Sequence, residues 1–431
     1  MLRQIEGSRG VAEAVAMSRP EVICAYPITP QTHIVEALSA KVKAGQLAAE
    51  FLNVESEFAA MSVAIGASAA GARAYTATAS QGLLFMCEAV YNAAGLGLPI
   101  VMTVANRAIG APINIWNDHS DSMSQRDAGW LQLFAETNQE ALDLHIQAFR
   151  IAETLSLPVM VCMDGFLLTH ASERMDLPEQ EQVDAFLPPY QPRQVLDPAD
   201  PVSIGAMVGP EAFTEVRYLA HARMLQALDL IPEIQRDFQQ TFGRDSGGLV
   251  RPYLLDDADV VVVALGSVLG TIKDAVDELR ADGLRIGVLG ITTYRPFPAH
   301  AVREALGTGH KRLVVVERAL APGTGGMVTA DVRTALAGRP GYVSTVVAGL
   351  GGRAVTKKSL RGMLTGACEG TLEPFSFLDL DTGLVDRELS RMRATRKSGP
   401  SAENMLRDLG VPSRGGQGAS SPQANTASKI G

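Results

Sequence analysis

A carboxylate at the start of an uncharged helical segment is the feature of this sequence best suited to chemistry. Glu57 lies in Asn-Val-Glu-Ser-Glu-Phe-Ala-Ala-Met (53–61), and residues 58–70 carry no charge. An acid in the first turn of a helix gains from the helix dipole, which is an ordinary structural role. In a water-poor site, the same group could hydrogen-bond a ring nitrogen of a ligand and stabilise an unusual tautomer. Spacing alone does not separate Glu57 from its neighbour Glu55.

An arginine directly after an apolar segment could bind an anionic substrate. Arg107 follows the run Ile100–Ala105 and begins the loop Arg-Ala-Ile-Gly-Ala-Pro (107–112). A guanidinium can hold a carboxylate through two parallel hydrogen bonds. A lone arginine is more often the partner of a structural ion pair, so both interpretations stay open.

A proline-flanked turn follows another apolar segment. In Tyr-Pro-Ile-Thr-Pro-Gln-Thr (26–32), Pro27 and Pro30 favour an extended turn, and the hydroxyls of Thr29 and Thr32 lie close to an expected helix start. These hydroxyls could contact a ligand. An ordinary capped turn between a strand and a helix explains the pattern equally well.

Two further loops contain polar side chains. Ser80-Gln81-Gly82 could present backbone N–H groups to a ligand, although this is a common kind of strand-to-helix turn. The run Asp-His-Ser-Asp (118–121) suggests a metal site or a catalytic triad. A second supporting ligand cluster is missing, and triads are assembled by geometry rather than by adjacency, so we favour loop capping or an inter-subunit contact.

Alternating short apolar runs and Ala-rich segments must position these loops. The expected strands are 22–26, 74–78, 100–105 and 158–163, and the expected helices are 30–44, 57–70, 83–94 and 139–155, the last capped by Asn138. Strands buried on both faces and separated by helices indicate a parallel α/β sheet. Ligands of such sheets bind at loops that follow the carboxyl ends of the strands.

The pattern predicts a second α/β unit and two connecting regions. Its expected strands are 260–266, 285–291, 312–320 and 342–347, and its expected helices are 271–279, 300–306 and 327–336. We expect a first α/β domain at 1–175, a second at 251–370, a linker and helical arm at 176–250, and an extension at 371–431. The arm should hold a helix near 211–242 that is broken at Pro232. The extension should be disordered from about residue 413, where Gly, Ser and Gln dominate.

Composition excludes several classes of protein. The formal net charge of −9 argues against a nucleic-acid-binding protein. The four cysteines form no CxxC pair, so we expect no metal centre in this chain. The N-terminus lacks the apolar run of an export signal, and no apolar segment approaches the roughly 20 residues that span a bilayer. We therefore expect a soluble, cytoplasmic protein without a membrane interaction.

Taken together and in order, these motifs resemble one family. The segments are YPITPQT, NVESEFAAM, TATASQGLLFM and VANRAIGAPINIWNDHSDSMSQRDAGW, followed by VVVVALGSVLGTIKDAVDELR, RPFP and VVVERALAPGTGG. They closely resemble the alpha subunit of the multi-subunit 2-oxoacid:ferredoxin oxidoreductases, and the pyruvate type (pyruvate synthase, or pyruvate:ferredoxin oxidoreductase) is the nearest. The resemblance covers roughly residues 3–370.

This resemblance implies a fold, a cofactor and roles for particular residues. The family uses thiamine diphosphate; its first domain is of the pyrimidine-binding type and its second resembles the transketolase C-terminal domain. Glu57 matches the catalytic glutamate that hydrogen-bonds the aminopyrimidine ring. Thr29 and Arg107 match substrate-binding residues. By the same resemblance we expect Pro27, Ser80 and Gln81, with Glu57, to contribute to cofactor binding.

The resemblance also implies that other subunits complete the enzyme. No GDG segment is present to hold Mg²⁺ and diphosphate, and no cysteines are spaced for iron–sulfur clusters. A thiamine-diphosphate-binding beta subunit and gamma and ferredoxin-like subunits or domains would supply these parts. The expected reaction converts pyruvate and coenzyme A to acetyl-CoA and CO₂, with electrons passed to ferredoxin. The alternatives are a branched-chain 2-oxoacid as substrate, a non-catalytic scaffold or regulatory subunit, and a carbohydrate-type thiamine transferase.

Overall fold

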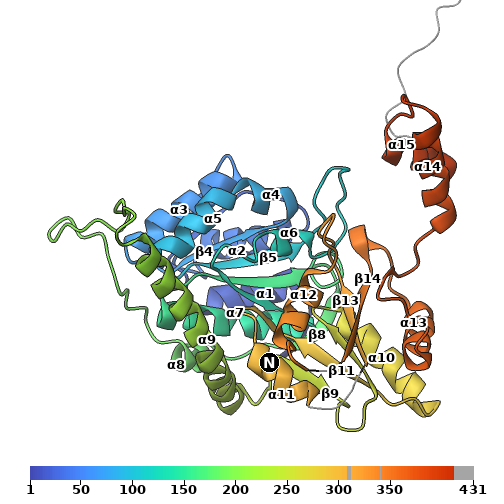
Figure 1. Cartoon of the computed structure of the whole chain (residues 1–431). Coiled ribbons are helices and arrows are strands. Elements are labelled where there is room, and N and C mark those ends of the chain that lie inside the picture. The colour runs from blue at the N-terminus through green and yellow to red at the C-terminus, as the bar shows by residue number, and fades with distance from the viewer. Residues whose placement is uncertain (308–311, 340, 412–431) are drawn as a thin grey trace, which may run out of the picture. The chain divides into compact units, whose positions relative to one another are not determined.

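A computed structural model describes residues 1–307, 312–339 and 341–411 of the chain. It contains two compact units, Met1–Leu378 and a second that begins at Asp379 (Figure 1). The first unit holds two large β-sheets, each covered by helices, together with a long helical arm. This architecture confirms the predicted fold class.

The first large sheet positions the loops named above. Its strands, in spatial order, are β12 (Thr293–Arg295), β6 (Leu131–Phe134), β7 (Val159–Asp164), β5 (Val101–Asn106), β4 (Ala74–Thr78), β2 (Val22–Ala25) and β3 (Glu50–Asn53). Neighbouring strands are parallel, except that β12 runs antiparallel to β6. The four predicted strands of this region are confirmed. The sequence analysis did not foresee that β12, which follows β11 of the second sheet, would extend this one.

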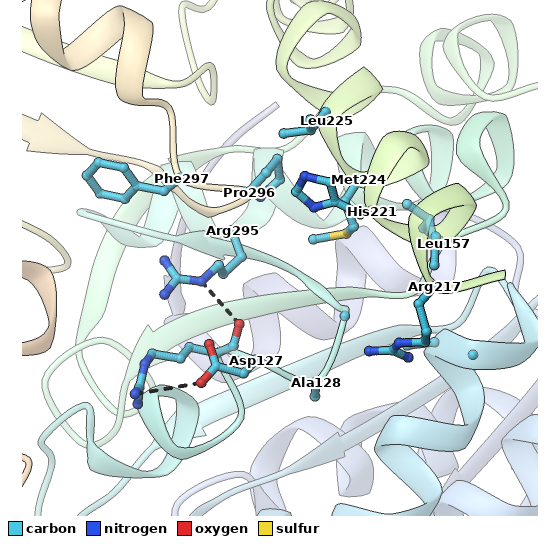
Figure 2. Close-up of a pocket in the computed structure, with 15 residues that line it drawn as sticks. Asp127, Ala128, Leu157, Arg217, His221, Met224, Leu225, Arg295, Pro296 and Phe297 are labelled. Atoms are coloured by element: carbon cyan, nitrogen blue, oxygen red, sulfur yellow. Dashed lines mark hydrogen bonds and ion pairs between the residues drawn. The ribbon is translucent and has the colours of Figure 1, made fainter. Parts of the chain in front are cut away.

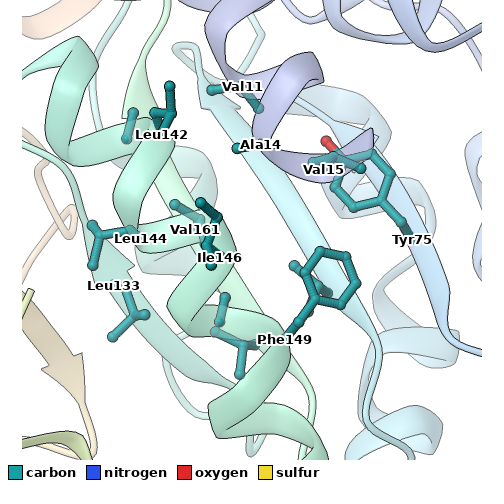
Figure 3. Packing of buried hydrophobic residues seen from close by; sticks show 14 of the residues in the cluster. Val11, Ala14, Val15, Tyr75, Leu133, Leu142, Leu144, Ile146, Phe149 and Val161 are labelled. Carbon is teal, nitrogen blue, oxygen red and sulfur yellow. The ribbon is translucent and has the colours of Figure 1, made fainter. Parts of the chain in front are cut away.

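Helices cover both faces of the first sheet. They are α1 (Gly7–Met17), α2 (Thr32–Lys43), α3 (Glu57–Ala69), α4 (Ser80–Phe85), α5 (Cys87–Leu96), α6 (Ser120–Ser124) and α7 (Asn138–Leu155). Successive side chains of β5 enter different apolar clusters: Val101 packs with α1 and α7, whereas Met102 packs with α3 and α5. Figure 3 shows the first of these clusters, in which Val11, Val15 and Phe149 meet Tyr75.

The cap of α7 differs from the prediction. Thr137, not Asn138, is the N-cap residue, and its hydroxyl accepts a hydrogen bond from the backbone N–H of Glu140 at 3.1 Å. Thr137 has the extended backbone conformation of a cap, whereas Asn138 is already helical and buried. The first turn of α7 also holds an acidic residue, Glu140, where the helix dipole favours negative charge.

The second large sheet is also mostly parallel. Its order is β15 (Phe375–Phe377), β14 (Tyr342–Val347), β13 (Arg312–Glu317), β10 (Val260–Ala264), β11 (Ile286–Ile291) and β9 (Val250–Tyr253), with β9 antiparallel to β11. Its helices are α10 (Val268–Ala281), α11 (Ala299–Leu306), α12 (Met327–Ala335) and α13 (Lys357–Glu369), and a short 3₁₀ turn spans Leu350–Gly352. The four strands and three helices predicted here are confirmed within a few residues.

The arm between the sheets is a single long helix. A small antiparallel pair, β1 (Leu2–Glu6) and β8 (Ser172–Asp176), and helix α8 (Gln180–Phe186) precede α9 (Phe213–Phe242). The predicted break at Pro232 is wrong, because α9 continues through that residue. Its buried side chains Ala227, Ile231, Ile234 and Phe238 recur on one face on both sides of the proline. Packing of this stripe against α7 stabilises the helix despite the hydrogen bond that proline cannot make.

The second compact unit contains two helices in its described part, α14 (Thr382–Ala394) and α15 (Ser401–Asp408). Arg391 and Asp408 form an ion pair between them at 2.9 Å. The tail expected to be disordered from about residue 413 lies outside the described residues. Among the helices that the structure describes, none combines the length and the apolar character needed to cross a membrane.

Candidate active site at the carboxyl edge of the first sheet

Three predicted loops meet at the carboxyl edge of the first sheet. Thr29, Ser80 and Arg107 follow the neighbouring strands β2, β4 and β5. The guanidinium of Arg107 donates a hydrogen bond from Nη1 to the backbone carbonyl of Thr29 at 3.0 Å. The fold therefore places these residues, which lie up to 78 positions apart, within one small region.

Glu57 lies at the buried start of α3. The hydroxyl of Ser56 caps this helix by accepting a hydrogen bond from the N–H of Ala59 at 3.1 Å. The helix start leaves Glu57 only 8% exposed, whereas Glu55 stays exposed. Among the residues that the structure describes, Glu57 has neither a hydrogen-bond nor an ion-pair partner. A buried carboxylate in this state lacks a donor that a ligand could supply.

A glycine and a threonine border the Glu57 carboxylate. A methyl group added to Gly82 would lie 2.7 Å from Glu57 Oε1 and 2.6 Å from Thr78 Oγ1, so the carboxylate lies directly against the glycine backbone. Within the described residues, the buried hydroxyls of Thr76 and Thr78 on β4 have no hydrogen-bond partner either. The unpaired carboxylate of Glu57 beside the unpaired hydroxyl of Thr78 fits the hydrogen-bonding edge of a nitrogen heterocycle such as an aminopyrimidine.

Arg107 is 6% exposed and held in place by backbone carbonyls. Its Nε donates to the carbonyl of Asn114 at 2.9 Å, in addition to the bond to Thr29. Burial lowers the pKa of Arg107, and the negative charge of Asp121 partly opposes this shift. In the described part of the chain, the Nη2 group finds no acceptor. It is therefore available to a carboxylate of a substrate.

Asp121 connects the loops and was missed as a site residue. Its Oδ2 accepts hydrogen bonds from the backbone N–H groups of Ser80 and Arg107, both at 2.9 Å. Its Oδ1 accepts from Asn106 Nδ2 at 2.8 Å and from the N–H of Ser122 at 2.7 Å. Burial raises the pKa of Asp121 to about 6, although these donors act in the opposite direction. The predicted loop-capping role of this acidic run is confirmed.

The remaining residues predicted to bind the cofactor differ in whether their side chains are free to contact a ligand. The Ser80 hydroxyl is used internally, since its single proton is shared between two acceptors, the carbonyl of Ala108 at 2.5 Å and Gln81 Oε1. The amide nitrogen of Gln81 lies beside Gly110, 2.5 Å from where a methyl group on that glycine would be. Pro27 is exposed in its turn. Ser80 is thus held as a backbone element of the site, and Gln81 keeps its amide donors.

A buried charge network joins this edge to the second sheet. His119 Nε2 lies 2.8 Å from Asp164 Oδ1, and Ser267 donates its backbone N–H to Asp164 Oδ2 at 2.9 Å. Burial alone would raise the pKa of Asp164, but His119 and Arg318 outweigh that effect and lower it strongly. Serine and histidine both contact the aspartate rather than each other, so the group is not arranged as a catalytic triad.

Within residues 1–307, 312–339 and 341–411, no three His, Cys, Asp or Glu side chains gather closely enough to hold a metal ion. The cysteines of this part of the chain are free thiols, and Cys24 and Cys162 are buried.

Comparisons with known proteins match the part of the chain that contains the candidate site. Residues 13–236 match the family model described as pyruvate flavodoxin/ferredoxin oxidoreductase, thiamine diphosphate-binding, and residues 258–360 match core domain II of pyruvate:ferredoxin oxidoreductase. A 2-oxoglutarate:ferredoxin oxidoreductase from Magnetococcus marinus shares the fold, with a TM-score of 0.67 at 19% identity. The match covers 85% of this chain and 65% of that chain.

Curated relatives are considerably closer in sequence. The pyruvate synthase subunit PorA of Methanosarcina barkeri is 51% identical, over 74% of this chain and 80% of its own length. PorA of Methanothermobacter thermautotrophicus is 44% identical, over 83% and 92%. The ketoisovalerate oxidoreductase subunit VorA of Pyrococcus abyssi is 39% identical, over 83% and 91%. The chain therefore belongs to the pyruvate flavodoxin/ferredoxin oxidoreductase family and carries its thiamine diphosphate-binding domain.

Proposed function

We propose that this chain is the alpha-type subunit of a multi-subunit enzyme that converts pyruvate and coenzyme A to acetyl-CoA and CO₂ and passes electrons to ferredoxin. The observation that carries the proposal is the buried, unpaired carboxylate of Glu57 in the thiamine diphosphate-binding domain. The PorA relatives, at 44–51% identity, support pyruvate as the substrate.

Glu57 would hold the aminopyrimidine ring of the cofactor through a hydrogen bond at a ring nitrogen. Its negative charge would favour a proton on that nitrogen, because an ion pair in a low-dielectric pocket is stronger than one in water. When bound, thiamine diphosphate supplies a carbon nucleophile for the keto group and takes up the electron pair that CO₂ leaves behind. The absence of a side chain at Gly82 leaves the space in which the Glu57 carboxylate lies, and the start of α3 fixes the position of Glu57.

Arg107 would bind and orient the substrate carboxylate. The two backbone carbonyls that hold the guanidinium leave Nη2 for the ligand, so the arginine is oriented before the substrate arrives. Asp121 positions this group by fixing the backbone of Arg107 and of Ser80 with one carboxylate. Thr29 would border the substrate from the adjacent loop.

Partner subunits would complete the site. Exposed apolar side chains, among them Phe58 next to Glu57 and Phe85 on α4, lie beside it, with ring centroids 6.4 Å apart. Such side chains next to a half-site suit the face on which a diphosphate- and Mg²⁺-binding beta subunit would dock. The iron–sulfur clusters that receive the electrons would reside in gamma and ferredoxin-like subunits or domains.

The test is an assay of the chain with and without its partners. The assembled complex should reduce a low-potential dye with pyruvate and coenzyme A, faster than with 3-methyl-2-oxobutanoate, and the isolated chain should not. Turnover by the isolated chain would overturn the division of labour. A preference for the branched substrate would move the proposal to the VorA-like activity.

A further inference from the structure

A cavity lies at the edge of the first sheet opposite to the one that holds Arg107. Its volume is about 410 Å³, within the range of small-molecule sites. It is bordered by the end of α5, by the segments that precede β6 and β7, by the residues that follow β12, and by α9 (Figure 2). The segments before β6 and β7 lead into the amino ends of these strands, and β12, which runs antiparallel to β6, ends at the same edge. The cavity is therefore separate from the candidate active site at the carboxyl ends.

The charged side chains that line this cavity are mostly cationic. Arg126, Arg217 and Arg295 line it, against one carboxylate, Asp127. Arg295 is paired with Asp331 at 2.9 Å, and Arg126 lies 3.6 Å from Asp127. These two arginines are therefore compensated, whereas Arg217 has no acidic partner among the described residues. In a chain with a net charge of −9, an uncompensated guanidinium in a cavity indicates an anionic ligand.

Two polar side chains of α9 are available to such a ligand. Arg217 and His221 are four residues apart, so they lie on the same face of the helix, and both line the cavity. Neither has a hydrogen-bond or ion-pair partner among the described residues. Figure 2 shows them on the side of the cavity formed by α9, with Arg295 and Phe297 on the side of β12.

The rest of the wall is apolar. Leu157, Met224, Pro296 and Phe297 contribute carbon surface next to these cations. Inorganic ions alone would gain nothing from that surface, whereas an organic molecule would bury its apolar part against it. We propose that the cavity binds a small organic anion. Its carboxylate or phosphate group is held by Arg217 and His221, and its apolar body packs against Met224 and Phe297.

Phenyl phosphate is a suitable probe, with inorganic phosphate and phenol as its separate halves. We expect isothermal titration of the assembled complex to show that phenyl phosphate binds more tightly than either half. Arg217→Gln should weaken that binding at least about tenfold, because a charge-assisted hydrogen bond is lost. Arg236→Gln changes an exposed arginine of the same helix that does not line the cavity, and should leave binding unchanged.

A second variant separates the two halves of the proposed site. Phe297→Ala should weaken binding of phenyl phosphate and leave that of inorganic phosphate as it was. Equal affinities in the wild type and Arg217→Gln would overturn the proposal, and so would equal affinities for inorganic and phenyl phosphate. Binding to the isolated chain but not to the complex would also overturn it, since the cavity would then be covered by a partner. None of these results depends on the oxidoreductase activity.

Discussion

Substituting Gly82 by alanine removes no functional group, yet it should disable the site. Gly82 lies in α4, and its missing side chain is where Glu57 and Thr78 come closest. The added methyl would lie 2.7 Å from Glu57 Oε1, whereas ordinary contacts begin near 3.4 Å. The Glu57 side chain must therefore move by about 0.7 Å and the Thr78 hydroxyl by about 0.8 Å, or α4 must move instead.

The effect on stability should be small because two terms oppose each other. Overpacking costs about 1–3 kcal/mol, and replacing glycine by alanine in a helix stabilises it by about 1 kcal/mol. The net loss in the free energy of unfolding should be about 0–2 kcal/mol. The effect on turnover should be much larger, since a displacement of about 1 Å at a reacting group can lower the rate about 100-fold.

The assay compares Gly82→Ala with Gly66→Ala in the assembled complex. Gly66 lies inside α3, the helix that Glu57 begins, and apart from its own helical turn and chain neighbours no described atom is within 4 Å of an added methyl group. Gly66→Ala should raise the thermal midpoint slightly and keep the wild-type rate of pyruvate-dependent dye reduction. If Gly82→Ala retained the rate of Gly66→Ala, the packing of Glu57 against Gly82 would have no catalytic role and the reasoning would be refuted.

Three further perturbations test neighbouring parts of the account. Burial raises the pKa of Asp121 to about 6, so between about pH 4 and pH 6 the folded state binds a proton that the unfolded state has released. The resulting stabilisation, about 3 kcal/mol, is present below this window and is lost as the pH rises through it. The stability of Asp121→Asn, followed by thermal unfolding, should not show this fall between about pH 4 and pH 6. A difference in stability between variant and wild type that stays constant across the window would contradict the prediction. Arg107→Lys should raise the KM for pyruvate about tenfold or more with a smaller change in kcat, because an ammonium cannot reproduce the guanidinium geometry; a wild-type KM would exclude the proposed carboxylate contact. Thr137→Ala should lower the free energy of unfolding by about 1 kcal/mol through loss of the α7 cap, whereas Asn138→Ala should not act through that cap.

Local patterns predicted the elements whose environment is uniform. The strand predicted at 342–347 is β14, with the same bounds, because four of its residues are buried in succession and both ends meet turn residues. The predicted break at Pro232 was wrong because the environment of this helix is not set by local sequence. Helix propensity is a local property, whereas the stripe that includes Ile231 and Ile234 is stabilised by packing against another helix.

In the candidate site, too, some residues could be predicted from local sequence and others could not. Glu57 and Arg107 could be singled out because each stands beside an uncharged or apolar run. That Glu57 rather than Glu55 is buried depends on the Ser56 cap, which sets where α3 begins. Asp121 acts on a loop 41 residues earlier in the chain, and no spacing rule relates such distant positions.

Contacts between the two sheets were equally inaccessible to sequence patterns. Strand β12 is only three residues long and pairs with β6, some 160 residues away along the chain. Its apolar content is too small for a period-2 signal. Such a strand is defined by the edge that it joins, which only the folded chain provides.

The central claim concerns the carboxylate of Glu57, and one substitution tests it most directly. In the assembled complex, Glu57→Gln keeps the size of the side chain and removes its charge, and Glu55→Gln makes the same change at the exposed neighbouring acid. Release of CO₂ from pyruvate should fall at least about 100-fold in Glu57→Gln and stay at the wild-type rate in Glu55→Gln, with both complexes fully assembled. An unchanged rate of CO₂ release in Glu57→Gln would contradict the proposed role of this residue.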